Sequence, residues 1–511
     1  MDQDTDSLSA EPGVWRYARA RRARLLIDGE EYFATMQQAM LKARQRILMI
    51  GWDFDTRIHL AQGRRWWHKG RKAQYPRRLG SFIVWLARHN PGLEIRILKW
   101  SIGALQFLTR GSMLLDLVRW VPHRRIDFKF DTAHPPGCSH HQKIVVMDET
   151  FAVCGGIDMT QGRWDTREHR ADDPRRTAPG GKAYGPWHDA ALMMEGEVAV
   201  ALADLGHTRW EHAGGKPLPR CTAPEQSCWP DGVEPHFKDV EIGIARSRAE
   251  HAGLAAVSEV EELFRRHIAR ARRFIYAENQ YFASRAICEA LARRLAEPDP
   301  PEIVIVHPAS ADGWLECLAM DTARTTLVEA IRELDGNDRF HIYAPYADET
   351  PIYVHAKLMI VDDEVLRVGS ANFNNRSMGL DSECDVFIDA RRPGNGHAAP
   401  AIRDLRLSLL GEHCGITPDE VAQLEEKAGS MAAMIALLGG REGCRLRPFH
   451  PPANGDLEEA LATMQLLDPE SPEEMFALSS GRNGLLRPGS LLARARNRLA
   501  RRRAAKRRRD N

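Results

Sequence analysis

Residues 141–158 have the sequence HQKIVVMDETFAVCGGID, and residues 355–372 have the sequence HAKLMIVDDEVLRVGSAN. Both stretches contain the motif H-x-K-x4-D, and in both a Gly follows the Asp at the same offset. A motif of this length that recurs with matched spacing indicates an internal duplication, which decides the architecture before any single element is considered.

The sequence around the two motifs repeats the same order of elements. In each half a helix precedes a strand, a second strand follows, and a short β-rich run leads into the motif. These elements are expected at 32–46, 47–51, 94–99 and 126–130 in the first half, and at 257–273, 274–277, 302–307 and 340–343 in the second. The pattern predicts an α/β fold of two similar lobes, each a mixed β-sheet flanked by helices, packed face to face as a pseudo-two-fold dimer within one chain.

Changes in composition divide the chain further. Gly, Pro, Cys and polar residues replace periodic apolar residues near 214–233, and a second break is expected near residue 411. We therefore expect an N-terminal segment at 1–20, a first lobe at 21–215, a linker at 216–233, a second lobe at 234–410, a mostly helical extension at 411–493 and a basic disordered tail at 494–511. No chemistry follows from the sequence of the extension.

The motif residues predict a chemistry. Residues two apart on a strand point to the same face, so His141 and Lys143 project into one site, as do His355 and Lys357. Phosphodiester cleavage needs a nucleophile, positive charge near the oxyanion and an acid for the leaving oxygen. One imidazole can attack phosphorus to form a phosphohistidine while the other protonates the leaving alcohol. Because the lysines neutralise the phosphate oxygens, we expect a site without a metal or another cofactor.

Further residues belong to the same motifs. Asp148 and Asp362 complete the two catalytic motifs, but each follows an apolar run typical of a buried strand, which favours a structural role for both. Small or hydroxyl-bearing residues come next and would let a phosphate approach the backbone closely. These candidate phosphate-binding residues are Gly155, Gly156, Ser370 and Asn372.

The paired motifs resemble the HKD signature of the phospholipase D superfamily, over about residues 20–410. Surrounding sequences strengthen the resemblance and are more similar to its phospholipid-directed, eukaryote-like branch than to its short nucleases: Gly51-Trp52-Asp53, Gly162-Arg163-Trp164-Asp165, Pro186-Trp187-His188-Asp189, Glu278-Asn279-Gln280-Tyr281, Asn374-Asn375-Arg376-Ser377 and Asp381-Ser382-Glu383. The resemblance implies that His141 attacks, that His355 is the acid, and that Asp189 and Glu383 orient the imidazoles.

The chain departs from the family pattern at Asp158, where many members have Asn, as this chain has at Asn372. An anion at this position would repel a phosphate. We therefore expect Asp158 to lie against Lys143 or another cation rather than to contact the substrate.

Charge is distributed unevenly along the chain. Residues 494–511 contain ten Lys or Arg and one Asp, a local charge of +9, so the remainder carries −8 of the total of +1. Such a run can bind anionic lipid headgroups, at about 1 kcal/mol per basic residue, or nucleic acid, or simply keep the protein in solution.

Other features of the sequence bear on compartment. No apolar run approaches the roughly 20 residues that cross a bilayer, and the acidic start at Met1–Asp6 is not that of a secretory signal. The nine cysteines include no C-x-x-C pair, which favours reduced thiols. We expect a cytoplasmic monomer that is soluble or peripheral to a membrane.

Three classes of function compete: a phospholipid headgroup hydrolase or phosphatidyltransferase, a nuclease and an inactive scaffold. The intact His and Lys of both motifs argue against the scaffold, and the scarcity of basic and aromatic tracks within the lobes argues against an obligate nucleic-acid partner. One segment, 64–72 (RRWWHKGRK), suits a membrane interface or a solvated loop. Cardiolipin-synthase-like members usually have N-terminal membrane spans, so we favour a peripheral phospholipase D, with cardiolipin-synthase-like transfer as the alternative.

Overall fold

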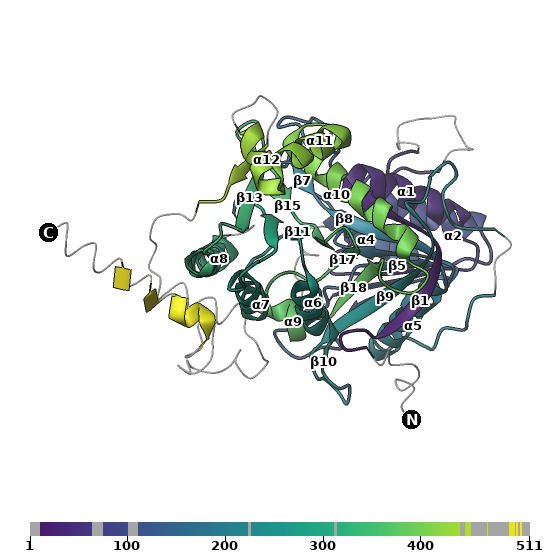
Figure 1. Ribbon diagram of the computed structural model, residues 1–511. Helices are drawn as coiled ribbons and strands as arrows, with labels where there is room; N and C mark the ends of the chain where they lie inside the picture. Colours follow the sequence, from purple (N-terminus) through teal and green to yellow (C-terminus); the bar gives the residue numbers. More distant parts are fainter. Residues whose placement is uncertain are drawn as a thin grey trace.

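The computed structural model describes residues 11–63, 75–100, 111–222, 226–310, 314–439, 445–450, 468, 490–495, 497–498 and 501–502. Figure 1 shows a mixed α/β fold in which helices cover a large mixed sheet. This fold class agrees with the prediction from the duplicated motifs. The Trp-rich segment at 64–72 lies outside the described residues, and so do residues 451–467 and 469–489 of the predicted helical extension.

The first half of the fold runs from β1 (Arg16–Ile27) and α1 (Asp28–Lys42) to α5 (Glu197–His212). Between them lie β2 (Arg46–Gly51), α2 (Leu79–His89), β3 (Glu94–Trp100), α4 (Gly111–Trp120), β4 (Ile126–Asp131), β5 (Ile144–Met147), β6 (Phe151–Gly155), β7 (Trp187–His188) and β8 (Ala190–Gly196). The hydrogen-bonded order is β4-β3-β2-β5-β6-β8-β1, with β2, β3 and β4 parallel and the other pairs antiparallel.

The second half runs from β9 (Phe237–Arg248) to α10 (Ala399–Cys414). It contains β10 (Val257–Ser258), α6 (Glu259–Arg270), β11 (Phe274–Asn279), α7 (Arg285–Leu295), β12 (Glu302–Val306), α8 (Trp314–Leu334), β13 (Phe340–Ala347), β14 (Thr350–Pro351), β15 (Tyr353–Val354), β16 (Lys357–Val361), β17 (Val365–Gly369), α9 (Asn375–Gly379), β18 (Glu383–Asp389) and the 3-10 helix η3 (Gly396–Ala398). Its order, β13-β12-β11-β16-β17-β18-β9, matches that of the first half strand by strand.

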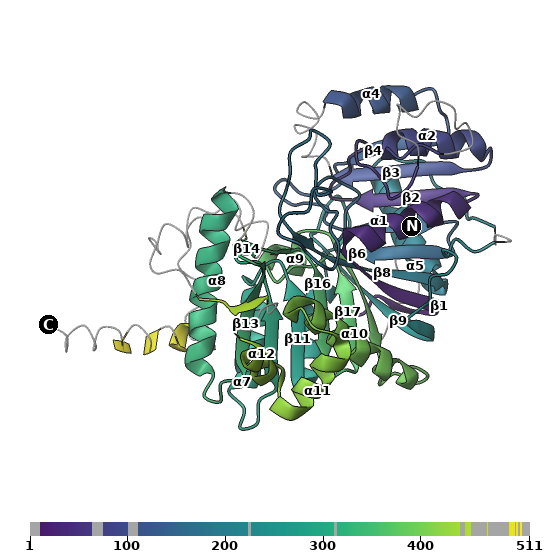
Figure 2. The same ribbon diagram turned by 90° about the horizontal axis from the view of Figure 1, so that it is seen from above.

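The two halves share one sheet because β1 pairs with β9, antiparallel, with Ala18 opposite Ile242. Figure 2 shows the first half at upper right and the second at lower left. Separate clusters of buried side chains lie under α1, α2 and α4 and under α6, α7 and α8. A third cluster contains residues of both halves, among them Ile144 of β5 and Leu358 of β16, so apolar burial also joins the halves.

The predicted boundary near residue 411 is wrong, because α10 continues through Gly411 to Cys414 and ends at Gly415, whose φ is 68°. Gly411 is small for a packing reason: a Cβ there would lie 2.6 Å from the carbonyl oxygen of Ile416. Beyond α10 lie α11 (Pro418–Ala428), α12 (Met431–Leu438) and β19 (Leu446–Pro448), which pairs with β13. Gly411 therefore allows a tight fold-back of the chain where we expected a break.

Six described residues of the predicted tail, Arg494, Ala495, Asn497, Arg498, Arg501 and Arg502, are helical where we expected no regular structure. Ala495 is buried, and the Arg502 guanidinium lies 2.8 Å from a carboxylate oxygen of Glu333. Among the described residues, no helix combines the length and the apolar character needed to cross a membrane.

Candidate active site

Both histidine motifs begin where a strand of one half meets the other half. His141 precedes β5, and its backbone N–H donates to the Ser382 carbonyl at 2.9 Å. His355 precedes β16, and its N–H donates to the His188 carbonyl at 2.7 Å. His141 is therefore held next to Glu383, which follows Ser382. His355 is held next to Asp189, which follows His188.

The two carboxylates predicted to orient imidazoles each lie within hydrogen-bonding distance of an imidazole in the other half. Glu383 places both carboxylate oxygens 3.1 Å from Nδ1 of His141, and Asp189 Oδ2 lies 2.7 Å from Nδ1 of His355. A carboxylate that accepts from Nδ1–H fixes the tautomer in which Nε2 holds the lone pair. The sequence predicted these carboxylates, but the crossed pairing emerges only from the fold.

Hydroxyl groups hold Glu383 in place. Ser370 and Ser377 each donate a hydrogen bond from Oγ to a different oxygen of Glu383. Ser370, predicted to contact phosphate, thus contacts the carboxylate that supports His141. Burial raises the pKa of Glu383 to about 8.

The predicted phosphate-binding glycines also have another role. The amide of Gly155 donates to the Lys143 carbonyl at 3.3 Å and that of Gly156 to the Ala190 carbonyl at 2.9 Å, so the predicted role is wrong for these amides. A Cβ at Gly156 would lie only 2.1 Å from Asp189 Oδ1. Gly156 therefore leaves room for the carboxylate that supports His355.

The two motif lysines are buried and lie beside their histidines. Lys143 Nζ donates to the His141 carbonyl at 2.9 Å and lies 3.3 Å from Asp158 Oδ2, which confirms the expected pairing of Asp158. Lys357 Nζ donates to Gln280 Oε1 at 3.0 Å and to the His355 carbonyl. Burial lowers the pKa of Lys357 to about 7.

Asn372, the counterpart of Asp158 and a predicted phosphate contact, is buried, and its backbone amide donates to Ser377 Oγ at 3.1 Å. Its side-chain oxygen has no hydrogen-bond partner among the described residues. The side chain is thus the part of Asn372 that remains available to a ligand.

Electrostatics keep both imidazoles neutral in this structure. Burial, followed by the charges of Lys143 and Lys357, lowers the pKa of His141 well below its usual value. Burial, then Lys357 and Arg163, lowers the pKa of His355 in the same way. The charges of Lys143 and Lys357 lower the pKa of both histidines, so the two motifs form one site. A phosphodiester anion bound there would raise the pKa of both histidines.

Asp148 and Asp362 lie at the far ends of β5 and β16, about 20 Å along the strand from the histidines. Asp148 accepts from the backbone N–H groups of residues 44–46 at 2.7–2.8 Å, and Asp362 from those of residues 272–274 at 2.7–2.9 Å. Asp148 and Asp362 are therefore structural residues and not members of the catalytic set in which the motif had placed them. Each carboxylate ties a helix-to-strand turn to the end of a motif strand.

Aromatic side chains surround the histidines. The ring centroid of Trp187 lies 5.1 Å from that of His355, and the ring of Trp52 packs edge-on against His141. The Arg163 guanidinium lies 4.1 Å from the Trp187 ring centroid, which adds a third positive charge near His355. Arg163 and Gln280 were not predicted as site residues, although both belong to sequences that carry the family resemblance.

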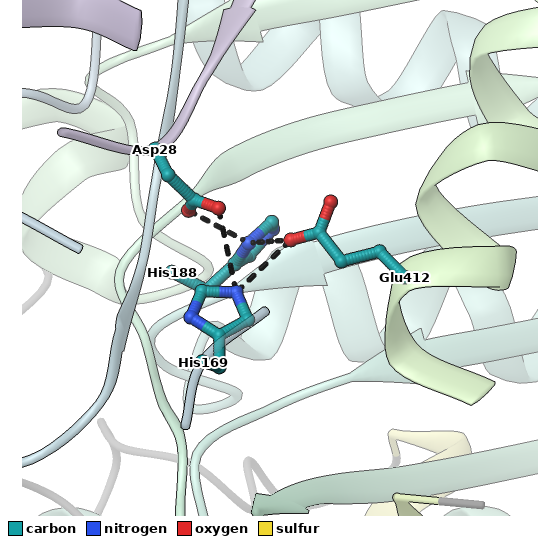
Figure 3. Close-up of side chains that lie close together, drawn as sticks. All are labelled: Asp28, His169, His188 and Glu412. Atoms are coloured by element: carbon teal, nitrogen blue, oxygen red, sulfur yellow. Dashed lines mark hydrogen bonds and ion pairs between the residues drawn. The ribbon is translucent and has the colours of Figure 1, made fainter. Parts of the chain in front are cut away.

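A second, buried polar cluster brings His188 of β7 together with Asp28, His169 and Glu412 (Figure 3). His188 Nδ1 lies 3.1 Å from Asp28 Oδ1 and 2.9 Å from Glu412 Oε1, and His169 Nε2 lies 3.0 Å from the same Glu412 oxygen. The other ring nitrogen of His188, Nε2, lies 2.8 Å from a carboxylate oxygen of Glu278. Two overlapping groups of described side chains could each hold a divalent cation: Asp28, His169, His188 and Glu412, and His188, Glu278 and His413.

The cluster contains residues to which the sequence assigned no chemistry. Glu412 comes from α10, in the segment predicted to be a separate extension, and His413 beside it lies 3.0 Å from Glu278 Oε1. His188 directly precedes Asp189, so the cluster also fixes the strand that positions His355. Only the fold brings residues so distant in sequence together.

The sequence and the fold are also similar to those of known proteins. Residues 264–398 match the family model described as "Cardiolipin synthase, PLD-like domain". The chain is 24% identical over 467 residues to phospholipase D A of Dictyostelium discoideum, covering 77% of this chain and 36% of that protein. It is 25% identical over 405 residues to phospholipase D alpha 1 of Carica papaya, covering 56% of this chain and 50% of that protein.

The chain thus spans between about a third and a half of the length of these relatives. Among solved structures, the fold is similar to that of phosphatidylserine synthase from Haemophilus influenzae, with a TM-score of 0.52 and 10% identity over 86% of this chain and 99% of that chain. With its two matched histidine motifs, a fold that brings them together and a phospholipase D-like domain at residues 264–398, the chain is similar to proteins of the phospholipase D superfamily.

Proposed function

We propose that the protein is a phospholipase D-type phosphodiesterase or phosphatidyltransferase that acts on phospholipid headgroups through a covalent phosphohistidine. The observation that carries this proposal is the pair of neutral imidazoles, each held at Nδ1 by a carboxylate of the other half, with Lys143 and Lys357 beside them. Relatives named phospholipase D and phosphatidylserine synthase support a phospholipid as substrate.

In the proposed reaction, Nε2 of His141 attacks phosphorus and the bond from phosphorus to the headgroup oxygen breaks. His355 donates its proton to the departing alcohol. The phosphate anion raises the pKa of His355 when it binds, so the neutral imidazole takes up from solvent the proton that it then donates. Lys143 and Lys357 neutralise the phosphoryl oxygens as charge develops.

In the second step, His355 removes a proton from water or from an acceptor alcohol, whose oxygen then attacks the phosphohistidine. Water yields phosphatidate and an alcohol yields a phosphatidyl ester, and both release His141. The two halves are, in this proposal, duplicated lobes related by a pseudo-two-fold axis, which places the imidazoles on opposite sides of phosphorus. A single chain supplies both histidines and both carboxylates, so we propose a functional monomer.

The assignment of attack to His141 rests on the family resemblance and has a direct test. A reaction quenched at mildly alkaline pH, where phosphohistidine survives, should leave labelled phosphate on the peptide that contains His141. His141→Ala and His355→Ala should each reduce turnover at least about 100-fold with an unchanged circular dichroism spectrum. Label on the His355 peptide would reverse the two roles.

Product analysis tests the function itself. The purified protein is incubated with vesicles of mixed phospholipids, with and without a primary alcohol, and products are identified by mass spectrometry. Phosphatidate alone indicates hydrolysis, a phosphatidyl alcohol indicates transfer, and cardiolipin indicates the alternative synthase activity. Cleavage of DNA or RNA with intact lipids would replace the proposal by a nuclease function.

We further propose that the protein associates peripherally with anionic membranes through the basic residues of 494–511. Vesicles of increasing anionic lipid content would measure this association. The expected dependence on salt is steep, because exposed charges are screened over about 10 Å at 0.1 M ionic strength.

A further inference from the structure

Asp468 comes from the predicted C-terminal extension and yet lies buried beside the second half, 3% exposed. Its carboxylate oxygens accept hydrogen bonds from the backbone N–H groups of Asn375 at 3.0 Å and Arg376 at 2.8 Å. Its own carbonyl accepts from Asn375 Nδ2 at 3.2 Å. A carboxylate at the first amides of a helical turn pairs donors that have no partner within the helix.

The turn that Asp468 holds, α9, contains a direct support of the proposed nucleophile. Ser377 of α9 donates from Oγ to Glu383 Oε1 at 2.7 Å, and Glu383 lies 3.1 Å from His141 Nδ1. The Asn374 side chain accepts from the Ser377 N–H, which orients the first turn further. Asp468 is thus connected to His141 through α9, Ser377 and Glu383.

A second route leads from α9 to the same histidine. The Arg376 guanidinium bonds to Asp381 at 2.8–2.9 Å and to the Gly137 carbonyl at 2.6 Å. Asp381 Oδ1 in turn accepts the backbone N–H of Ser139, two residues before His141, at 2.7 Å. A displacement of α9 would therefore disturb both the imidazole's carboxylate and the segment that leads into the motif.

His355 has no equivalent dependence on Asp468 among the described residues, because its carboxylate is held by other groups. Asp189 Oδ1 accepts from the Ala190 N–H at 2.8 Å, and the absence of a side chain at Gly156 leaves the space it occupies. The influence of Asp468 is thus directed to one of the two imidazoles.

We infer that Asp468 is a positioning residue for His141, through which the C-terminal extension completes the site. This inference rests on the proposed function, since His141 is there the nucleophile. Glu383 holds Nδ1 of His141 and so sets the fraction of protein molecules in which Nε2 points toward phosphorus. A less rigid α9 would lower that fraction and slow the attack, while the residues that contact the substrate stay the same.

The test compares Asp468→Asn and Asp468→Ala with a matched control, Asp335→Asn. Asp335 also accepts backbone amides, those of Asn337 at 3.3 Å and of Arg339 and Phe340 at 2.7 Å, but these lead into the start of β13 and have no link to Glu383 among the described residues. Single-turnover kinetics on a soluble short-chain phosphodiester separate the amplitude of phosphohistidine formation, which counts folded sites, from its rate constant.

The rate constant should fall at least about tenfold in Asp468→Ala, with amplitude and KM within twofold of the unchanged protein. Asp468→Asn retains one acceptor oxygen, so its rate constant should lie between those of Asp468→Ala and the unchanged protein. The rate constant of Asp335→Asn should equal that of the unchanged protein. A loss of amplitude with the rate constant preserved would assign Asp468 a merely structural role, and unchanged kinetics in Asp468→Ala would overturn the inference.

A second readout separates this inference from the proposed function. The His141 imidazole is followed by NMR in histidine-labelled protein, with His141→Ala for assignment. In Asp468→Ala its titration midpoint should move by about 0.5 pH unit or more, because Glu383 keeps the hydrogen bond from Ser370 but is held less firmly against Nδ1 when Ser377 shifts with α9. If the unchanged protein cleaves no phosphodiester, the proposed function fails while a moved midpoint still supports the link, and an unmoved midpoint refutes the link.

Discussion

Replacement of Gly156 by alanine is expected to disable the site while the protein remains folded. The new Cβ would lie 2.1 Å from Asp189 Oδ1, and real Cβ atoms essentially never approach closer than 3.0 Å. Asp189 must therefore retreat by about 0.9 Å. Along the bond to His355 Nδ1, now 2.7 Å, this retreat gives about 3.6 Å, beyond the length of a hydrogen bond.

The size of the effect follows from that lost bond. A hydrogen bond to a charged group contributes about 1.5–3 kcal/mol, and each 1.4 kcal/mol corresponds to a factor of ten, so the rate should fall about 10- to 150-fold. Overpacking costs about 1–3 kcal/mol of stability, which leaves a folded protein. Steady-state kinetics on a soluble phosphodiester and a thermal melt measure the two quantities.

Two controls sharpen the measurement. Gly185→Ala adds the same methyl group in the same connecting segment, where no heavy atom lies within 4 Å, and should have no effect. In an Asp189→Ala background, Gly156→Ala should add no further loss, because the two changes act through one bond. Activity of Gly156→Ala within twofold of the unchanged protein, or a loss that persists without Asp189, would refute the reasoning.

Three more outcomes are expected. Burial lowers the pKa of Lys357 to about 7, so its ammonium group is lost as pH rises through 7; kcat/KM should decline above that pH, and Lys357→Arg should move the decline upward. Asp148→Asn and Asp362→Asn should each reduce the free energy of unfolding by about 1–3 kcal/mol in denaturant melts, with kcat per folded molecule unchanged; a tenfold loss of kcat would return them to the catalytic set. Removal of residues 503–511, with five basic residues, should weaken binding to anionic vesicles but spare hydrolysis of a soluble substrate; an equal bound fraction at low salt would exclude the tail from membrane binding.

The sequence predicted the elements of the fold and the chemistry of the motifs because both depend on local spacing. His141 and Lys143 share a strand face by periodicity alone, and the repeat of this pattern implied a common site. Asp158 was expected beside a cation from its charge, and it lies against Lys143.

What the sequence did not reveal depends on contacts between distant segments. Gly156 follows its motif at an offset that suggested phosphate binding, but its neighbour in space is Asp189. Glu412 has no motif around it, and only the fold shows that this residue of α10 lies 2.9 Å from His188 of β7. The boundary near residue 411 was expected from local composition, which does not reveal that α10 continues to Cys414.

The pairing of β1 with β9 has a consequence for synthesis on the ribosome. Tyr17 of β1 is opposite Gly243 of β9, so the first strand of the chain must wait for more than 200 residues before one of its edges is covered. Until then the nascent first half exposes a strand edge open to pairing with another chain. A pause in translation before β9 would therefore lengthen the time for which this strand edge is exposed.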